Sequence, residues 1–415
     1  MHPIADSRGG GDPDPAYLMA FTDWLACASG GLAEPAARAM RASGDDLLAD
    51  VAFAATAGHV LDFDDTFADG VAHVSSTSAP AALVLAAHQC LSLRAALDAY
   101  AEGYEALAAV AAASHPALYD AGWHPTSVCG PVGAAVAASR LLGLPAAQRE
   151  TAIAVALLRA GGTRGAFGTD GKAIQVGLAA AAGVQGALLA RAGASVDPRA
   201  IHGPLGFEAV LGAGWPTADA GAPRPGAPRA GDSTSAIRRN WIKLHPSCLG
   251  THAAIDAAVE VRDRGQRRDQ DPIEVIVHPV SRQAAHLDEV TDGLSAKFSI
   301  PYCVAHTLVH GPPGVHDFAS IDATARDRSR LVSVTVDESL PEFGAVLSVG
   351  GHELARVGSP RGAPGRPLAA SELAAKVSDL AGDRLDGVLD DLEGPAAAAL
   401  SAAGLHRAGA TVGYP

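Results

Sequence analysis

The apolar residues between Tyr17 and His202 recur with the spacing of amphipathic and buried helices. These segments are rich in Ala and Leu and are separated by Gly, Pro, Ser and Thr. Because residues of high helix propensity dominate them, the pattern predicts helices rather than strands. Helices that are apolar nearly all round are expected deep in a bundle or in a dimer interface. The predicted helices cover residues 79–91, 94–113, 131–142, 149–160 and 172–191.

The pattern changes after a Gly/Pro/Ala-rich segment at residues 212–232. Beyond it, β-branched residues alternate or cluster as they do in strands. A second Gly/Pro-rich segment at 358–367 precedes a return to helical patterning. Strands are predicted at 273–278, 331–337 and 345–349, and helices at 247–261, 296–309, 370–380 and 386–402.

These elements predict a mainly α fold, with a large all-helical domain and an inserted smaller α+β domain. A chain of 415 residues exceeds what one hydrophobic core usually supports, so two domains are expected. The Gly/Pro/Asp-rich start predicts a flexible tail. The predicted boundaries are 1–16 for the N-terminal tail, 17–238 and 366–415 for the two parts of the helical domain, and 239–365 for the α+β domain.

Composition and charge narrow the class of protein. The formal net charge of −14 argues against a broad basic surface, so neither nucleic acid nor a membrane is expected as a partner. The start of the chain lacks a basic segment followed by an apolar one, and no stretch is a persuasive membrane span, so a cytoplasmic location is expected. The cysteines are scattered without a CxxC pair, which argues against zinc, iron–sulfur and disulfide frameworks. They are Cys27, Cys90, Cys129, Cys248 and Cys303.

Cationic or proton-active side chains recur at, or a few residues before, predicted helix starts. Helix N-termini offer unpaired N–H groups and a partial positive charge, so several such ends in one place would bind carboxylates. Taken singly, each residue is more often a loop histidine or a solvated lysine. The residues with this placement are His73, His124, Lys172, Lys243, His245 and Tyr302.

The sequence contains two partial matches to cofactor-binding motifs, and both lack required residues. Asp64, Asp65 and Asp69 resemble a magnesium-binding acidic motif, but the second motif of such enzymes needs an Asn with Ser and Glu at fixed spacing, and Asn240 lacks them. Gly171-Lys172 resembles the end of a phosphate-binding loop, but Ala173 replaces the required Ser or Thr. We therefore predict neither a metal nor an organic cofactor.

Five segments, in order, resemble the MmgE/PrpD superfamily, whose members include dehydratases, decarboxylases and epimerases of small polycarboxylates. The resemblance spans roughly residues 20 to 400, and the ordered set is more specific than any single piece. GTDGKAIQ departs from a more usual GTxTKPxH, so Gln175 stands where His is frequent. The matching pieces are LDFDDTF with His73 downstream, GWHPTSVCGPVGAA, GTDGKAIQVG, IKLHPSCLGTH and FSIPYCVAHTLVHG.

The resemblance implies a helical domain, an α+β lid and a pocket between them. It implies that Lys172 and Lys243 hold substrate carboxylates, and that His73 and His124 move protons. Asp62 would orient a neighbouring histidine or raise its basicity, and Tyr302 would donate to a carboxylate or leaving hydroxyl. The remaining implied contacts to substrate are those of Thr66 and His245.

The expected function is a metal-independent lyase, a dehydratase or decarboxylase, acting on a small di- or tricarboxylate by His/Lys/Tyr acid–base chemistry. An isomerase or epimerase would use the same residues, and a catalytically silent scaffold would keep the same fold. The resemblance also implies a homodimer through the helical domain, and Ala-rich buried helices are compatible with that expectation.

Overall fold

The computed structural model describes residues 14–216, 234–266 and 271–406. Residues 1–13 of the predicted tail and 217–232 of the predicted loop lie outside the described residues. The first helix, α1 (Pro15–Gly30), begins inside the predicted tail, because the Asp14 carboxylate accepts a hydrogen bond from the backbone N–H of Ala16 at 3.0 Å and caps the helix.

The larger part of the molecule is a bundle of helices that share one hydrophobic core. Two C-terminal helices, α17 (Ala370–Ala381) and α18 (Ala396–Ala402), return to this bundle after the smaller part. The main helices besides α1 are α2 (Pro35–Ala42), α3 (Leu47–His59), α4 (Ser75–His88), α5 (Leu93–Ser114), α7 (Pro125–Leu141), α8 (Ala146–Leu157) and α9 (Gly171–Arg191).

Helix α9 packs in the bundle against α3, α7 and α8. Small residues allow the close approach: a Cβ placed on Gly183 would lie 2.7 Å from the carbonyl oxygen of Pro131, and one on Gly186 would lie 2.4 Å from that of Ala152. By length and composition alone α9 could cross a membrane. Two thirds of its most apolar window is buried inside the protein, as in a core helix.

The smaller part combines helices with a four-stranded sheet of order β4-β3-β5-β6. β3 (Ile273–Val277) pairs parallel with β4 (Val332–Val336) and antiparallel with β5 (Ala345–Val349). Every second residue of β3 is buried, whereas every residue of β5 is buried. Helix α12 (Leu249–Asp263) packs against β5, β6 and α15 (Ile300–His310), and β6 (His352–Val357) forms one edge of the sheet.

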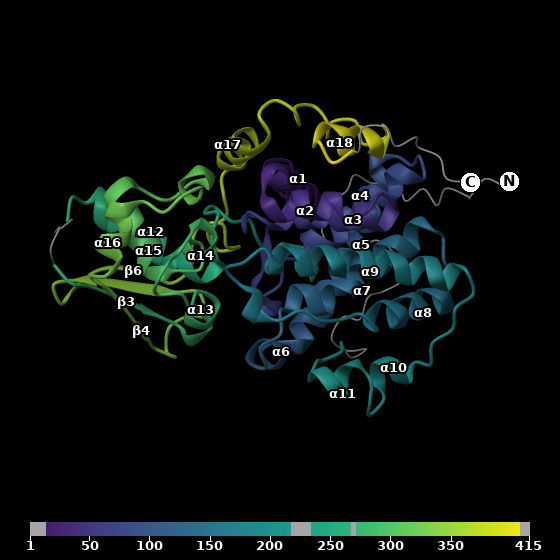
Figure 1. Ribbon diagram of the computed structural model, residues 1–415, viewed down its shortest axis with the longest axis horizontal. Helices are drawn as coiled ribbons and strands as arrows, with labels where there is room; N and C mark the ends of the chain where they lie inside the picture. Colours follow the sequence, from purple (N-terminus) through teal and green to yellow (C-terminus); the bar gives the residue numbers. More distant parts are fainter. Residues whose placement is uncertain (1–13, 217–233, 267–270, 407–415) are drawn as a thin grey trace.

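Figure 1 shows the sheet-containing part beside the helical bundle, with α17 and α18 lying over α1 and α4. A short antiparallel ladder between β1 (Thr66–Phe67) and β2 (Asn240–Trp241) joins segments far apart in the sequence. It brings the chain after α3 next to the chain that enters the smaller part. The predicted mainly α fold is confirmed; the exact domain boundaries stay predictions.

Several predicted elements differ in extent. The helix predicted at 386–402 begins only at Ala396, because Gly387 has a φ of +69° and Gly394-Pro395 ends the preceding turns. Pro80 and Pro131, predicted at helix starts, lie inside α4 and α7, which begin five or six residues earlier. Strand β6 was not predicted, since its exposed edge residues are charged and hide the alternation.

Candidate active site

Asp62 lies at the centre of a buried ionic cluster in the turn after α3. Its carboxylate Oδ1 accepts hydrogen bonds from Lys172 Nζ at 3.0 Å and from Lys243 Nζ at 2.8 Å. All three residues are less than one tenth exposed. Burial opposes ionisation of Asp62, but the attraction of Lys172 and then Lys243 outweighs it and holds the pKa of the carboxyl well below its usual range. Asp62 is therefore an anion that holds two lysines in place.

Three successive carbonyl groups of this turn each accept a hydrogen bond from a different lysine. Lys297 Nζ donates to the Leu61 oxygen at 2.6 Å, and Lys376 Nζ donates to the Phe63 oxygen at 2.7 Å. The oxygen between them, that of Asp62, accepts from Lys243. Asp62 has a φ of +52°, a left-handed conformation that Asp tolerates better than most residues. The lysines thus hold the turn from three different segments of the chain.

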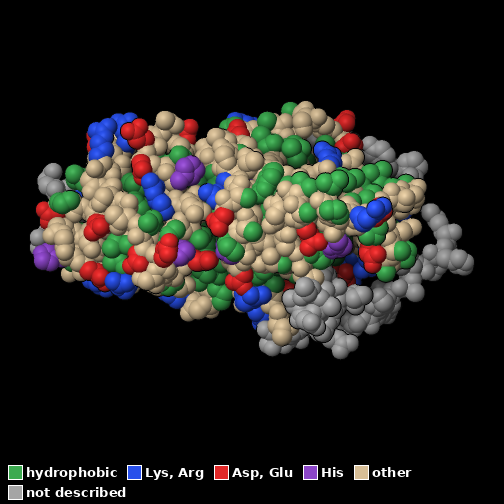
Figure 2. All heavy atoms as spheres, turned by 90° about the horizontal axis from the view of Figure 1, so that it is seen from below, with side chains coloured by type: hydrophobic (Ala, Val, Ile, Leu, Met, Phe, Trp, Pro, Cys, Tyr) green, Lys and Arg blue, Asp and Glu red, His purple; other side chains and the backbone are tan. Residues whose placement is uncertain are grey.

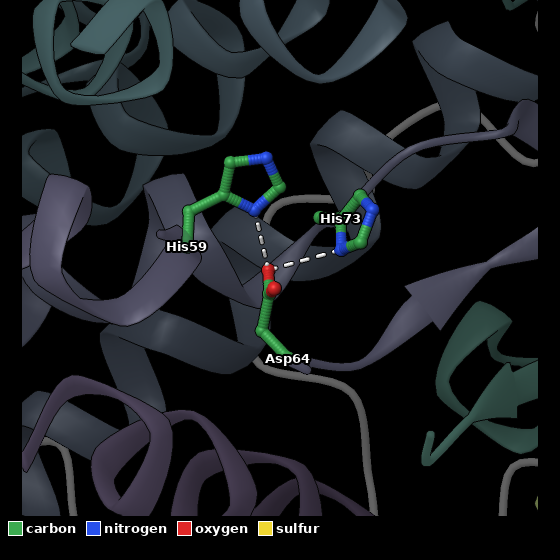
Figure 3. Close-up of side chains that lie close together, drawn as sticks. All are labelled: His59, Asp64 and His73. Atoms are coloured by element: carbon green, nitrogen blue, oxygen red, sulfur yellow. Dashed lines mark hydrogen bonds and ion pairs between the residues drawn. The ribbon is translucent and has the colours of Figure 1, made fainter. Parts of the chain in front are cut away.

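Asp64 forms the second centre of the site. His59 Nδ1 and His73 Nδ1 lie 2.8 and 3.0 Å from the same carboxylate oxygen, Oδ2 (Figure 3). The Ser76 hydroxyl donates to that oxygen as well. Burial disfavours charge on the rings, so it lowers the pKa of His59 and lowers that of His73 to about 4. Both rings are neutral at pH 7, and each donates its Nδ1–H to Asp64.

His124 begins α7 as its N-cap and lies beside these two rings. Its ring stacks on His59 at a centroid distance of 5.9 Å and meets Phe167 edge-on at 5.0 Å. Gln175 Nε2 lies 2.7 Å from its Nδ1. Burial, followed by the positive charge of Lys172, lowers the pKa of His124 well below its usual range. His124 is therefore a third neutral imidazole in the site.

Two aromatic rings form an apolar wall against the ionic cluster. Lys172 Nζ lies 5.4 Å from the centroid of Phe167 and 5.5 Å from that of Phe298. The two rings also contact each other at 5.6 Å. Such a wall excludes water, which strengthens the electrostatic interactions of the ammonium group with any bound anion.

Most of the predicted site residues lie together. Lys172 and Lys243 both contact Asp62, and His73 lies between Asp62 and Asp64. His73 Nε2 is 3.6 Å from Asp62 Oδ1. The Thr66 hydroxyl is 3.4 Å from His73 Nδ1. The residues of this cluster that the sequence predicted are Asp62, Thr66, His73, His124, Lys172 and Lys243.

Tyr302 and His245 have other partners. The Tyr302 hydroxyl accepts a hydrogen bond from the backbone N–H of Asp322 at 3.0 Å. His245 Nε2 lies 3.0 Å from Asp256 Oδ1. Within the described ranges, no hydrogen bond, ion pair or ring contact joins either residue to Asp62 or to the three histidines. The structure thus holds both residues on the sheet-containing side, and their roles toward substrate stay predictions.

Two carboxylates face His73. Asp64 accepts the His73 Nδ1–H, whereas Asp62 Oδ1 lies 3.6 Å from Nε2 and also accepts from two lysines. The role predicted for Asp62 toward a histidine stays a prediction. Asp64, Asp65 and Asp69, which form the rejected magnesium motif, differ in their partners. Asp65 accepts from Ser75, and Asp69 pairs with Arg239, so the three acidic residues serve different partners.

His59, Asp64 and His73 offer ligand atoms within 4.8 Å of one another, a spacing that a metal ion could use. The two Nδ1–Oδ2 distances are those of hydrogen bonds, and a proton on each Nδ1 accounts for both contacts. The cluster therefore fits a hydrogen-bonded centre without further groups.

Sequence reasoning missed His59, Asp64, Lys297 and Lys376 as members of the site. One signal was available for the two lysines. The whole chain holds four lysines, Lys172, Lys243, Lys297 and Lys376, among 31 basic residues, the rest being arginines. All four ammonium groups contact residues 61–63. Because the chain otherwise uses arginine, we infer that these four positions need the compact ammonium group of lysine, which the planar and more weakly hydrated guanidinium group of arginine does not replace.

A cavity of about 640 Å³ lies next to the ionic cluster, on the other side of Phe63 and Lys376. Its walls come from α12, the 312–315 loop and α17, and include His245. Asp62, Asp64 and His124 do not line it. The cluster itself is nearly closed in this conformation, so a substrate needs movement of the surrounding segments to enter.

Two protein-family models match this chain and cover most of the segments that build the site. The MmgE/PrpD N-terminal domain matches residues 46–218, and the MmgE/PrpD C-terminal domain matches residues 245–393. The chain belongs to the MmgE/PrpD family. Asp62, His73, His124 and Lys172 of this family member lie in the N-terminal match, whereas Lys243 lies between the two matches.

Two relatives of this MmgE/PrpD protein share 30% of aligned residues with it. One is cis-aconitate decarboxylase from Homo sapiens, over 148 residues, which are 34% of this chain and 28% of the relative. The other is cis-aconitate decarboxylase-like protein oryM from Aspergillus oryzae, over 212 residues, which are 48% of this chain and 43% of the relative. The alignments thus span less than half of either relative.

The buried histidines make stability depend on pH. Burial lowers the pKa of His59, His124 and His252, and that of His73 to about 4, whereas the unfolded chain titrates them near 6.5. Between these values the unfolded state binds more protons than the folded state, so stability is lost as the pH falls. We expect the free energy of unfolding, measured with urea at constant ionic strength, to decrease from pH 6.5 toward pH 4. A flat profile over this interval would contradict neutral buried rings.

Proposed function

We propose that this chain is a lyase that acts on a small di- or tricarboxylate by metal-independent acid–base chemistry. One observation carries the proposal: two buried lysines share a single carboxylate directly beside three neutral histidines. An ammonium group has three N–H donors, so Lys172 and Lys243 can bind a substrate carboxylate while each keeps its contact with Asp62. The closed, apolar surroundings make such contacts stronger than they would be in water.

The site also offers acceptors for a substrate proton. Asp62 Oδ2 is buried and has no hydrogen-bond partner among the described residues. A substrate hydroxyl or carboxylic acid group would supply the donor that this oxygen lacks. His73 is neutral, with Nδ1–H donated to Asp64, so its Nε2 can accept a proton from carbon or oxygen.

Dehydration and decarboxylation draw on the same residues in different ways. Dehydration needs a base for an acidic C–H and stabilisation of the departing oxygen, whereas decarboxylation needs stabilisation of a carbanion and then delivery of a proton. The names of the two relatives, cis-aconitate decarboxylase and cis-aconitate decarboxylase-like protein, support an unsaturated tricarboxylate as the first substrate to test.

The test uses chelator-treated, full-length protein with candidate acids in deuterated water, followed by NMR and mass spectrometry. A lyase releases water or carbon dioxide from one of the acids, and continued turnover after chelation supports independence from metal. Exchange of a C–H for C–D with no loss of mass would instead identify an isomerase or epimerase. Unchanged acids across the whole panel would contradict the enzyme assignment and leave a scaffold role.

Lysine chemistry gives an independent test of where substrate binds. Because the chain has four lysines and all of them contact the Asp62 turn, an amine-selective reagent reports on the site itself. We expect a bound polycarboxylate to protect Lys172 and Lys243 from labelling, as read by peptide mass spectrometry. Labelling that occurs without substrate and is not reduced by substrate would separate these lysines from substrate binding.

We also propose that the chain forms a homodimer through the helical part and works in the cytoplasm. Exposed large apolar residues are concentrated between residues 158 and 210, with Leu178 and Leu189 on α9 47% and 43% exposed. Figure 2 shows apolar side chains in a long tract over the helical part, while charged side chains are denser over the smaller part. All five cysteines are free thiols, which suits a reducing compartment. Sedimentation equilibrium of the wild type and of Leu178→Glu tests the dimer.

A further inference from the structure

The amide of Gln175 has one favourable orientation. Its Oε1 accepts the backbone N–H of Thr163 at 3.0 Å, and its Nε2 lies 3.4 Å from the Thr163 carbonyl oxygen. Rotating the amide by half a turn would place two donors, or two acceptors, face to face at these contacts. The backbone of Thr163 therefore determines which end of Gln175 faces His124.

This orientation determines where His124 carries its proton. Gln175 Nε2 can only donate, and it lies 2.7 Å from His124 Nδ1, so Nδ1 must be the acceptor. The proton of the neutral ring then sits on Nε2. The loop geometry supports this contact: the backbone N–H of His124 donates to the Gly162 oxygen at 3.0 Å. Gly162 has a φ of +110°, and a Cβ there would lie 2.7 Å from Gln175 Oε1.

His73 has the opposite polarity, which here means that the ring nitrogens carrying the proton and the lone pair are exchanged relative to His124. Its Nδ1 lies 3.0 Å from Asp64 Oδ2, and an ionised carboxylate only accepts, so Nδ1 carries the proton. The lone pair of His73 is then on Nε2, which lies 3.6 Å from Asp62 Oδ1. The site thus holds one imidazole that presents a lone pair at Nε2 and one that presents an N–H at Nε2, and His59 contacts both rings.

We propose that these fixed tautomers divide the roles in the reaction, with His73 Nε2 as the proton acceptor and His124 Nε2–H as a neutral hydrogen-bond donor. Gln175 is then a positioning residue that sets the polarity of His124. The division of roles rests on the proposed function, whereas the tautomers themselves do not.

The proton-transfer step follows from this polarity. When His73 Nε2 takes a proton from a substrate carbon, the C–H bond breaks and its electron pair is delocalised onto a substrate carboxylate oxygen. His73 becomes an imidazolium ion that Asp64 stabilises. His124 keeps its proton and donates a hydrogen bond from Nε2 to the oxygen where charge develops, as preorganised donors do in oxyanion sites.

Replacing Gln175 with Glu inverts the predicted polarity of His124. A carboxylate at this position still accepts the Thr163 N–H, but it can only accept from His124, so the ring proton moves to Nδ1 and Nε2 becomes a lone pair. The matched control is Gln185→Glu, the same change on the same helix, where Arg159 at 2.8 Å is the side chain's hydrogen-bond partner among the described residues.

The tautomers are read from the ¹⁵N shifts of ¹⁵N-histidine-labelled protein without substrate, with His124 assigned from the spectrum of His124→Gln. We expect a protonated Nε2 and an unprotonated Nδ1 in the wild type and in Gln185→Glu, and the reverse in Gln175→Glu. A wild-type ring protonated on Nδ1, or the same tautomer in Gln175→Glu, would overturn the assignment of polarity.

Kinetics then test the roles. Loss of one donor to a developing oxyanion typically lowers kcat by about 10²–10³-fold, so Gln175→Glu is expected to lose that much while Gln185→Glu keeps the wild-type rate. An inverted tautomer with unchanged kcat would overturn the role of His124. If the wild type shows the predicted tautomers but turns over none of the acids, the proposed function and the division of roles are refuted. The assignment of the tautomers would still hold.

Discussion

Replacing Lys172 with methionine is expected to weaken binding of the polycarboxylate substrate by about 2–5 kcal/mol, which is roughly 30-fold to several thousand-fold in Kd. The ammonium group is buried beside Asp62 and against two aromatic rings, so a bound carboxylate would lose a desolvated, charge-assisted partner. Methionine keeps much of the apolar stem that packs on Phe167 and Phe298. Asp62 keeps its second ion pair, with Lys243, so the turn is expected to stay in place.

Calorimetric titration of the variant with the substrate identified for the wild type measures this loss. Arg191→Met is the matched control, because it removes a cation from the exposed end of the same helix, α9. We expect the control to bind as the wild type does. Equal affinities of Lys172→Met and the control would remove Lys172 from the substrate site.

The sequence predicted the fold well where one local pattern decided the structure. Helix propensity located α5 and α9 almost to the residue, and β-branched alternation located β3 and β5. The prediction failed where the local preference of a residue did not decide the element that forms. Pro131 suits a helix start, yet α7 begins earlier, at Pro125 directly after His124. An edge strand such as β6 lacks the apolar alternation on which strand prediction depends.

The candidate site was predictable only as a set of residue types at helix starts. His73, His124 and Lys172 had local signals, but the partners of His124 and Lys172 are 51 and 110 residues away in the sequence. Lys243 lies 181 residues from Asp62, and the β1–β2 ladder that joins the two segments is too short to have a pattern of its own. The roles of Asp62 and Asp64 depend on which side each carboxylate faces in a left-handed turn, and spacing alone does not encode that.

Replacing Asp64 with asparagine is expected to lower kcat by about 10²–10⁴-fold, the range that a general base contributes, because the neutral amide no longer stabilises the imidazolium ion that His73 forms when it takes a proton. His59, His73 and Ser76 all donate to Oδ2 of Asp64, so the asparagine oxygen is expected at that position. His73 then keeps its proton on Nδ1, the turn keeps its geometry, and only the negative charge is lost.

Asp65→Asn gives a matched control one residue away. Burial raises the pKa of Asp65 well above its usual range, so its carboxyl is favoured in the neutral form, and an amide of the same shape replaces it with little change in charge. Its Oδ2 accepts from Ser75 rather than from a histidine. Steady-state kinetics of the two variants, with urea unfolding to compare their stabilities, separate the roles. If Asp64→Asn and Asp65→Asn slowed turnover equally, the loss would reflect packing of the turn, and Asp64 would not be the residue that makes His73 a base.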